Sequence, residues 1–336
     1  MKNGKIVFLG ATGTVGGYAV PELAAAGFDV VAVGRRESDG GFFASCGVPY
    51  VSMDISVKSD FGKLPREGVA AVVNLAGAVP ARMKGYDPQA YVDSIVTGAL
   101  NSLEYARECG ADRIVFAQSV ADVIHLYGSR TPIDADSPRK FPLTGDHAVY
   151  SICKNAAVDL IEHYHAAFGL KRFILRFPNI YLYHPNPKYF LDGELRYQSY
   201  RLMIERAKKG EPLEIWGDPG AMRDMVYVKD CVQIIEKSLT APVEGGIYNV
   251  GTGIGTSMKE QVEGIVEVFS PEGRKSPVIP RPDKPSGAEY IMDISKTVRD
   301  LGYSPRYGYR DYLKDMKKEM ELKRFRPIWG EDKEYE

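Results

Sequence analysis

The stretch Ile6-Val7-Phe8-Leu9-Gly10-Ala11-Thr12-Gly13-Thr14-Val15-Gly16 joins a short apolar run directly to three glycines spaced three residues apart. A continuous apolar run of this length is typical of a parallel strand that is buried on both faces. The glycines permit a tight turn, a close approach of the backbone to a pyrophosphate, and close packing of a following helix. That helix would offer unpaired N–H groups to the phosphates. The stretch therefore predicts a dinucleotide site made of Gly10, Thr12, Gly13, Thr14, Val15 and Gly16.

The composition is that of an ordinary globular protein, with 336 residues, 44% of them hydrophobic, and a net charge of −1. This charge gives no reason to expect a nucleic-acid or membrane partner. The four cysteines include no C-x-x-C pair, so neither a disulfide framework nor a metal site is expected. The first strand begins by Lys5 and no apolar run is long enough to span a bilayer, so the expected location is the cytoplasm.

Strand and helix patterns alternate through the first half of the chain. Strands are expected at 6–9, 29–33, 48–53, 70–75, 113–117 and 172–176, and long helices at about 91–109 and 148–168. Repeated strand–helix units predict an α/β fold, a doubly wound parallel sheet with helices on both faces. Residues 1–177 would thus form mainly the dinucleotide-binding domain.

The second half has a different rhythm. Tyrosines and prolines in 182–200 are typical of a long functional loop. A smaller region over 178–321 is expected from patterns at 202–209, 213–216, 258–269 and 298–301, and parts of it could return to the main sheet. Glycines at 251–257 resemble a second phosphate loop, but Ser257 and Glu260 have the spacing of a capping box that opens a helix. The charged tail 322–336 could be frayed or could pack on a partner.

The chemistry is indicated by Tyr150-Ser151-Ile152-Cys153-Lys154. On a helix these two end residues share a face, so the phenol and the ammonium project to the same side. A free tyrosine titrates near pH 10, and a nearby cation is expected to lower its pKa towards the working range. The motif follows a predicted strand that ends in Gln118-Ser119, which supplies a hydroxyl.

Together these motifs resemble the extended short-chain dehydrogenase/reductase family, the group of nucleotide-sugar epimerases, dehydratases and reductases. The resemblance implies a Rossmann fold and the catalytic set Ser119, Tyr150 and Lys154. Ser119 would hold the reacting oxygen, and Lys154 would hold the nicotinamide ribose. Dehydratases of the family carry Thr-Asp-Glu where this chain has Ser119-Val120-Ala121, so dehydration is disfavoured. The loop before Tyr127-Gly128 is also slightly longer than usual.

The resemblance also implies cofactor residues. Asp54-Ile55 matches a pair whose carboxylate accepts a hydrogen bond from the adenine, and Leu75-Ala76-Gly77 matches a strand end that lines a ribose. Asp54 could instead be a plain turn residue. After the second predicted strand the chain reads Gly34-Arg35-Arg36. Two guanidiniums suit a 2′-phosphate, so NADP is favoured over NAD.

Substrate residues are implied in the second half. Leu175-Arg176-x-x-Asn179-x-Tyr181 and Arg223-Asp224-x-Val226-x-Val228-x-Asp230 match family motifs, as does Arg281-Pro282. Asn179, Arg223 and Arg281 would bind the diphosphate of a nucleoside-diphosphate sugar. Alternatively, Arg223 would only pair with Asp224 or Asp230 on the surface.

Two activities are compatible with this site. A nucleotide-sugar epimerase would transfer hydride at a sugar carbon, with C4 the expected position, whereas a 4-keto-sugar reductase would consume NADPH. A non-catalytic cofactor sensor is a third hypothesis, against which the complete Ser119, Tyr150 and Lys154 set argues. The helices expected at 91–109 and 148–168 correspond to those that form the usual homodimer of the family.

Overall fold

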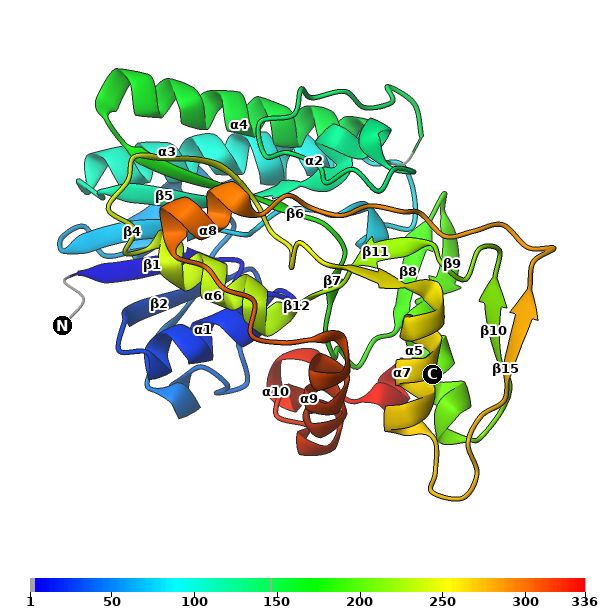
Figure 1. Cartoon of the computed structure of the whole chain (residues 1–336). Coiled ribbons are helices and arrows are strands. Elements are labelled where there is room, and N and C mark those ends of the chain that lie inside the picture. The colour runs from blue at the N-terminus through cyan, green and yellow to red at the C-terminus, as the bar shows by residue number, and fades with distance from the viewer. Residues whose placement is uncertain (1–3, 146, 336) are drawn as a thin grey trace.

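The computed structural model describes residues 4–145 and 147–335, and its centre is a seven-stranded parallel sheet (Figure 1). The strand order is β13-β6-β5-β4-β1-β2-β3. Their bounds are β1 Lys5–Leu9, β2 Asp29–Gly34, β3 Tyr50–Ser52, β4 Val69–Asn74, β5 Arg113–Ser119, β6 Lys171–Phe177 and β13 Gly245–Asn249. The order reverses between β1 and β4, as in a doubly wound Rossmann sheet. The predicted fold class is confirmed.

Helices cover both faces of this sheet (Figure 1). On one face lie α2 Pro88–Tyr91, α3 Gly98–Glu108 and α4 Ala148–Phe168; on the other lie α1 Gly16–Ala25, α6 Val228–Ser238 and α8 Ser295–Leu301. The helix expected over 91–109 begins earlier and is interrupted by a π-helical turn at Val92–Thr97. In a π-helical turn each backbone hydrogen bond spans five residues instead of the four of an α-helix. A hydrophobic period of 3.6 residues in the sequence does not reveal such a turn.

The alternation of β1 side chains divides the core into two layers. Ile6 and Phe8 pack into the cluster on the α1 side, whereas Val7 and Leu9 pack into the cluster under α3 and α4. All four side chains are almost fully buried. A strand that is covered on both faces needs apolar residues at every position, which is the pattern in the sequence.

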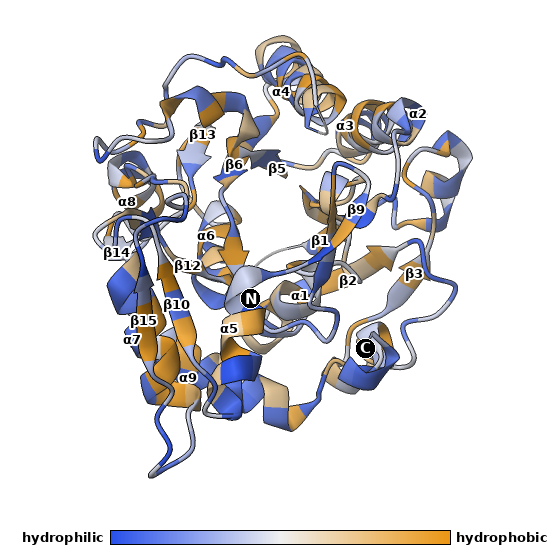
Figure 2. Ribbon diagram, turned by 90° about the vertical axis from the view of Figure 1, so that its right-hand side faces the viewer, coloured by the Kyte–Doolittle hydropathy of each residue, from blue (hydrophilic) through white to orange (hydrophobic). Residues whose placement is uncertain are grey.

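The second half of the chain forms a smaller lobe beside the sheet. Its helices are α5 Ser199–Lys208, α7 Met258–Phe269, α9 Tyr309–Leu322 and the short α10 Arg326–Trp329. Two-stranded sheets pair β10 Leu213–Trp216 with β15 Val278–Arg281, β11 Met222–Asp224 with β14 Gly255–Ser257, and β12 Val226–Tyr227 with β7 Ile180–Tyr181. Hydrophobic and hydrophilic residues interleave along β10, β15 and α7 (Figure 2).

The segment expected to be a long loop over 182–200 contains a hairpin. Strands β8 Lys188–Leu191 and β9 Glu194–Tyr197 pair antiparallel around Asp192-Gly193. Both turn residues have positive φ, 50° and 76°. This is the geometry that an Asp-Gly pair favours between two short strands, so the hairpin had a local sequence signal.

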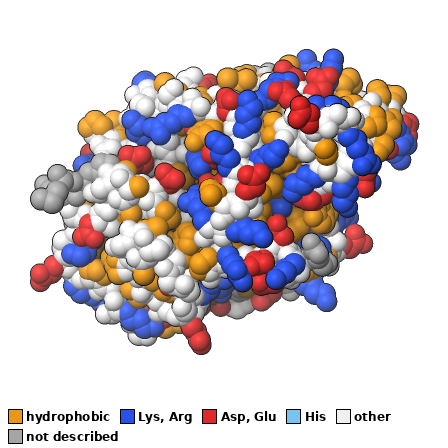
Figure 3. Space-filling model, turned by 90° about the horizontal axis from the view of Figure 1, so that it is seen from below, with side chains coloured by type: hydrophobic (Ala, Val, Ile, Leu, Met, Phe, Trp, Pro, Cys, Tyr) orange, Lys and Arg blue, Asp and Glu red, His pale blue; other side chains and the backbone are white. Residues whose placement is uncertain are grey.

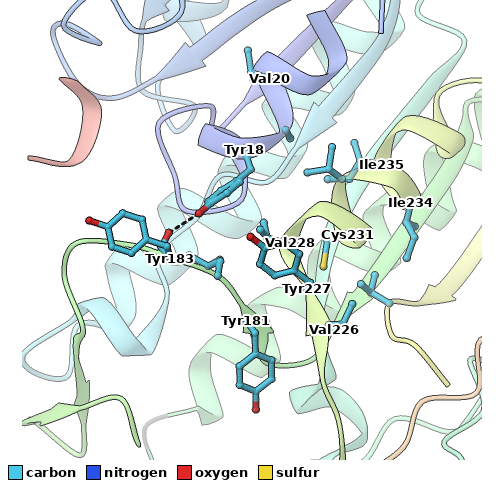
Figure 4. Packing of buried hydrophobic residues seen from close by; sticks show 14 of the residues in the cluster. Tyr18, Val20, Tyr181, Tyr183, Val226, Tyr227, Val228, Cys231, Ile234 and Ile235 are labelled. Carbon is cyan, nitrogen blue, oxygen red and sulfur yellow. Dashed lines mark hydrogen bonds between the residues drawn. The ribbon is translucent and has the colours of Figure 1, made fainter. Parts of the chain in front are cut away.

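Tyrosine side chains join the two halves of the molecule. Tyr18 on α1 donates a hydrogen bond to the carbonyl of Tyr183, at 2.9 Å (Figure 4). Tyr227 at the start of α6 lies in the same buried cluster, and it donates to Asp315 on α9. The hydroxyl groups find partners although the rings are buried, which such rings require.

The glycine-containing segment 251–257 shapes a helix start, as predicted. Ser257 and Glu260 form a reciprocal capping box at α7. The buried Asp224 carboxylate accepts bonds from the backbone N–H groups of Thr252 and Gly253. At the surface, acidic and basic side chains are intermixed, as the face in Figure 3 shows.

A buried ion pair fixes the chain that follows β5. The Arg176 guanidinium on β6 binds both carboxylate oxygens of Asp122 at 3.0–3.2 Å, and both side chains are almost fully buried. The same guanidinium donates to the Ala135 carbonyl and to the Asn249 side chain on β13. Three separate segments are thus held by one cation.

Replacing Arg176 by Met should destabilise the protein by about 3–5 kcal/mol, because the Asp122 carboxylate would remain buried without its partner. Chemical denaturation measures this loss. Arg196→Met is the matched control, since Arg196 pairs with Glu194 on the exposed hairpin and such pairs contribute about 0–1 kcal/mol. Equal losses in the two variants would contradict the importance of the buried pair.

Candidate active site

A cavity of about 810 Å³ opens at the carboxyl ends of the central strands. This is the edge at which doubly wound sheets bind ligands. Its lining includes every predicted cofactor and catalytic residue: Gly10, Thr12, Gly13, Thr14, Val15, Gly16, Arg35, Arg36, Asp54, Ile55, Leu75, Ala76, Gly77, Ser119, Tyr150 and Lys154. Asn179 lines the same cavity. The fold therefore brings together residues that are spread over 170 positions of the sequence.

The glycine-rich loop has the shape that a pyrophosphate requires. Gly10 has a φ of 89°, and a Cβ on Gly16 would lie 2.3 Å from the Gly10 carbonyl oxygen. The loop opens α1, whose N-cap residue Val15 has no side-chain oxygen to cap the helix. The N–H groups of Gly17 and Tyr18 in the first turn bond to the carbonyls of Gly13 and Val15. The residues that line the cavity at this helix end are Gly13 to Gly16, and the chain fits a dinucleotide there.

Tyr150 lies in the first turn of α4, beside the end of β5. It lines the cavity together with Ser119, whose hydroxyl oxygen accepts from the Ala121 N–H at 3.2 Å, and its ring is 5.9 Å from that of Tyr91. Burial raises the pKa of Tyr150 to about 12, although the nearby Ser119 side chain acts in the opposite direction. Tyr150 is therefore a neutral phenol at neutral pH in this environment.

Lys154 lies one helical turn further along α4. Its Nζ donates to the Ala117 carbonyl at 2.6 Å and lies 5.9 Å from the centre of the Tyr150 ring. Burial lowers the pKa of Lys154 to about 7. The expectation that Lys154 lowers the pKa of Tyr150 is wrong for the chain's own groups, because burial dominates the titration of both side chains.

Arg35 and Arg36, which follow β2, have different surroundings, so they do not form a matched pair of phosphate-binding groups. Arg36 donates to the carbonyl of Ile328 in the C-terminal segment, and its own carbonyl accepts from Tyr50 at 2.7 Å. Arg35 is exposed and lines the cavity. Asp54 accepts two bonds from Ser56 through one carboxylate oxygen. It therefore forms a local turn and lines the cavity at the same time.

The predicted substrate residues are not all brought together. Asn179 lines the cavity, but Arg223 and Arg281 do not belong to its lining. Arg223 lies 3.5 Å from the Tyr181 hydroxyl and donates to the Ala288 carbonyl. Arg281 pairs with Glu214 and Asp283 at 2.9 and 3.0 Å.

The alternative in which Arg223 pairs with Asp224 or Asp230 is not what the structure contains. Both carboxylates are buried. Asp224 accepts from the backbone of the 251–253 segment, and Asp230 accepts from the backbone N–H groups of Arg306 and Tyr307. These aspartates join segments of the lobe, and the Arg223 side chain extends towards Tyr181.

The family model described as "NAD dependent epimerase/dehydratase family" matches residues 6–251. This match covers most of the chain and includes both the glycine-rich loop and the Tyr150–Lys154 pair. The chain belongs to this family.

Relatives and solved structures extend the family match over most of the chain. A putative UDP-glucose 4-epimerase of Methanocaldococcus jannaschii is 27% identical over 311 residues, which cover 92% of this chain and 96% of the relative. The structure of a Thermotoga maritima UDP-glucose 4-epimerase with UDP-glucose has a TM-score of 0.76 at 22% identity, covering 95% and 99% of the two chains. A Thermus thermophilus UDP-glucose 4-epimerase in complex with NAD has a TM-score of 0.70 at 23% identity, covering 96% and 99%. These structural likenesses show the family's fold.

Sequence reasoning did not identify one wall of the cavity. Trp329 and Tyr335 of the C-terminal segment line it, together with His184, Asn186 and Arg82. No motif marks these residues, since they belong to segments whose position depends on packing. Within 4–145 and 147–335, no cluster of three or more metal-ligating side chains is present, and no helix could span a membrane.

The titration of Lys154 predicts a pH-dependent stability. Between about pH 7 and its ordinary pKa of 10.5, the unfolded chain carries a proton on Lys154 that the folded protein lacks. The free energy of unfolding should therefore rise with pH across this window. Lys154→Met should remove this rise of the unfolding free energy with pH. Its gain in stability over the wild type should be largest below about pH 7, where the wild type must bury a charge.

Denaturant unfolding at a series of pH values measures the difference between wild type and variant. Lys208→Met is the control, because Lys208 is exposed and pairs with Glu205 at the surface. Parallel stability curves for wild type and Lys154→Met would contradict the lowered pKa of Lys154.

Proposed function

We propose that this protein is an NAD(P)-dependent nucleotide-sugar epimerase that acts by hydride transfer at a sugar carbon, C4 in the simplest case. The observation that carries the proposal is the convergence of Ser119, Tyr150 and Lys154 on the cavity of the glycine-rich loop. The names of the relatives, UDP-glucose 4-epimerases, support the same substrate class.

In this proposal Tyr150 exchanges a proton with the oxygen of the reacting sugar carbon. As a neutral phenol it donates its proton to a carbonyl oxygen and becomes a phenolate, and in the reverse direction that phenolate receives the proton of the sugar hydroxyl. Ser119, which lines the same cavity as Tyr150, fixes the position of that oxygen. The nicotinamide, when bound, supplies and accepts the hydride, while the protein supplies orientation.

Lys154 has the position to bind a ribose at the floor of the cavity. Its Nζ is held by the Ala117 carbonyl, and two further N–H donors remain on an ammonium group. A pKa near 7 means that a hydroxyl or an anion beside it would favour the charged form. Lys154 would thereby position the cofactor beside Tyr150.

A second candidate function is an NADPH-dependent reductase of nucleotide 4-keto sugars. The observation that favours it is Arg35, an exposed guanidinium on the cavity wall, which would suit a 2′-phosphate. An epimerase retains its cofactor through turnover, whereas a reductase exchanges it in every cycle. The fate of the cofactor therefore distinguishes the two.

The test uses the purified protein with UDP-, dTDP-, GDP- and CDP-sugars. Interconversion of C4 epimers without net consumption of reduced cofactor supports the epimerase. Stoichiometric oxidation of NADPH in the presence of a 4-keto sugar supports the reductase. If no nucleotide sugar binds in calorimetric titration, the proposed substrate class is wrong.

Tyr150→Phe should lower turnover by about 10²–10⁴-fold, because the proton-transferring hydroxyl is lost. The Kd for the nucleotide sugar should change little, since the ring remains. Steady-state kinetics and calorimetry measure the two quantities. Tyr164→Phe, on the same helix and bonded to Glu104, is the control. Activity close to that of the wild type would exclude Tyr150 as the proton donor.

Arg35→Ala should weaken the binding of NADPH roughly ten- to a hundredfold and that of NADH much less. The reason is that a charge-assisted hydrogen bond to the 2′-phosphate contributes about 1.5–3 kcal/mol. Fluorescence titration with the two dinucleotides gives the ratio. Arg36→Ala is the comparison, since Arg36 already binds the Ile328 carbonyl. Equal weakening of both cofactors would make Arg35 an ordinary surface charge.

Arg223→Ala should raise the Kd of the nucleotide sugar roughly ten- to a hundredfold, if Arg223 binds the diphosphate by charged hydrogen bonds. Arg281→Ala should also raise this Kd, but by less, because Glu214 and Asp283 compete with the diphosphate for the Arg281 guanidinium. Calorimetry with both variants measures this. Unchanged binding in Arg223→Ala would remove it from the proposed diphosphate site.

We further propose a cytoplasmic homodimer that pairs α3 and α4 with their copies in a second subunit. Support comes from apolar side chains exposed on these helices, Leu100 and Ile152, which are 40% and 45% exposed. A C2 dimer would cover them. Sedimentation velocity measures the oligomeric state directly.

A further inference from the structure

The C-terminal segment 323–335 passes from the lobe back to the dinucleotide loop. It leaves α9 through Lys323, which has a positive φ of 48°, and its aromatic side chains are then buried. Phe325 stacks on Trp329 with ring centres 4.3 Å apart and packs on Tyr18 of α1 at 4.4 Å. This segment is therefore anchored on the Rossmann half.

Trp329 makes the closest contact with the glycine-rich loop. Its indole N–H donates to the Thr12 carbonyl at 3.0 Å. A Cβ placed on Gly17 would lie 2.5 Å from the indole ring. Gly17 lies outside the Gly10-x-x-Gly13-x-x-Gly16 pattern, so the ring of Trp329 gives a physical reason for a glycine at this position. Arg36, at the end of β2, donates to the neighbouring Ile328 carbonyl.

The same segment also contacts the opposite wall of the cavity. His184 packs on Trp329 with ring centres 4.6 Å apart, and Tyr183 donates to Asp332 at 2.7 Å. His184 accepts a bond at Nδ1 from the Asn186 N–H, so its ring carries its proton on Nε2. Tyr335 donates to the Trp329 carbonyl.

We propose that the C-terminal segment is a component of the dinucleotide site and that Trp329 is its positioning residue. Trp329 ties the glycine-rich loop to the 183–186 segment, and with Tyr335 it forms part of the cavity wall. Loosening these contacts would free the loop that holds the dinucleotide and part of the wall beside it. The segment therefore slows cofactor release, as an enzyme with a resident cofactor requires.

This inference rests on the proposed dinucleotide site and is independent of the sugar. The variants are Trp329→Ala, which removes the ring and its hydrogen bond, and Trp329→Phe, which keeps an aromatic ring without the N–H. Gly17→Ala displaces the ring from the other side. Trp216→Phe is the control. Trp216 is the other of the two tryptophans in the chain, and its side chain is 46% exposed on β10.

The measurement is the dissociation rate of bound NADH and NADPH, followed by cofactor fluorescence during displacement with excess oxidised dinucleotide. Trp329→Ala should release the cofactor about tenfold faster or more, because lost interface contacts act mainly on dissociation. Trp329→Phe and Gly17→Ala should have cofactor dissociation rates between those of Trp329→Ala and the wild type. Far-UV circular dichroism verifies that each variant is folded, and the two milder variants test the proposal if Trp329→Ala does not fold.

A second readout is independent of the rate. Because Trp329 lines the cavity, energy transfer from tryptophan to bound NADH should persist in Trp216→Phe and fall strongly in Trp329→Phe. Dissociation rates within about twofold of the wild type in all three variants would overturn the proposal, as would energy transfer that depends on Trp216.

If the rates change as expected while no nucleotide sugar is turned over, the proposed activity fails and this inference stands. If the wild type binds neither dinucleotide, both fail.

Discussion

The buried guanidinium of Arg176 is the constraint on which the shape of the cavity depends. A charge without exposure must be paired and fully hydrogen-bonded, and Arg176 meets this condition only when Asp122, Ala135 and Asn249 are all in place. These partners come from the chain after β5, from the loop before α4, and from the edge strand β13. Ser119 precedes Asp122 by three residues, so the position of the Ser119 hydroxyl is coupled to this network.

The pKa values of Tyr150 and Lys154 are shifted by burial more than by each other. Tyr150 and Lys154 share a helix face and a cavity, yet the low-polarity surroundings raise the pKa of the phenol to about 12 and lower that of the amine to about 7. Both shifts favour the neutral form. At neutral pH the chain alone therefore keeps Tyr150 protonated and leaves Lys154 close to half protonated, in a site where a charged dinucleotide is to be bound.

The dinucleotide loop is supported from both ends of the chain. Its own glycines set the turn, Trp329 donates to the Thr12 carbonyl within it, and Phe325 packs on Tyr18 of the helix that follows it. This contact joins residues more than 300 positions apart. Loops that bind phosphates work best on rigid supports, and a stacked aromatic cluster supplies rigidity without competing hydrogen bonds.

The sequence by itself determined six of the seven strands of the sheet, the glycine-rich loop and the Tyr150–Lys154 pair, but not the edge strand β13. These features are local: a doubly buried strand needs apolar residues throughout, a tight turn needs glycine, and residues four apart on a helix share a face. The hairpin at Asp192-Gly193 also had a local signal, which the density of tyrosines and prolines obscured. Only the tertiary structure decided the partners of Arg36 and Arg223, the pKa values of Tyr150 and Lys154, and the place of Trp329. These depend on burial and on contacts between distant segments, which no spacing within a motif encodes.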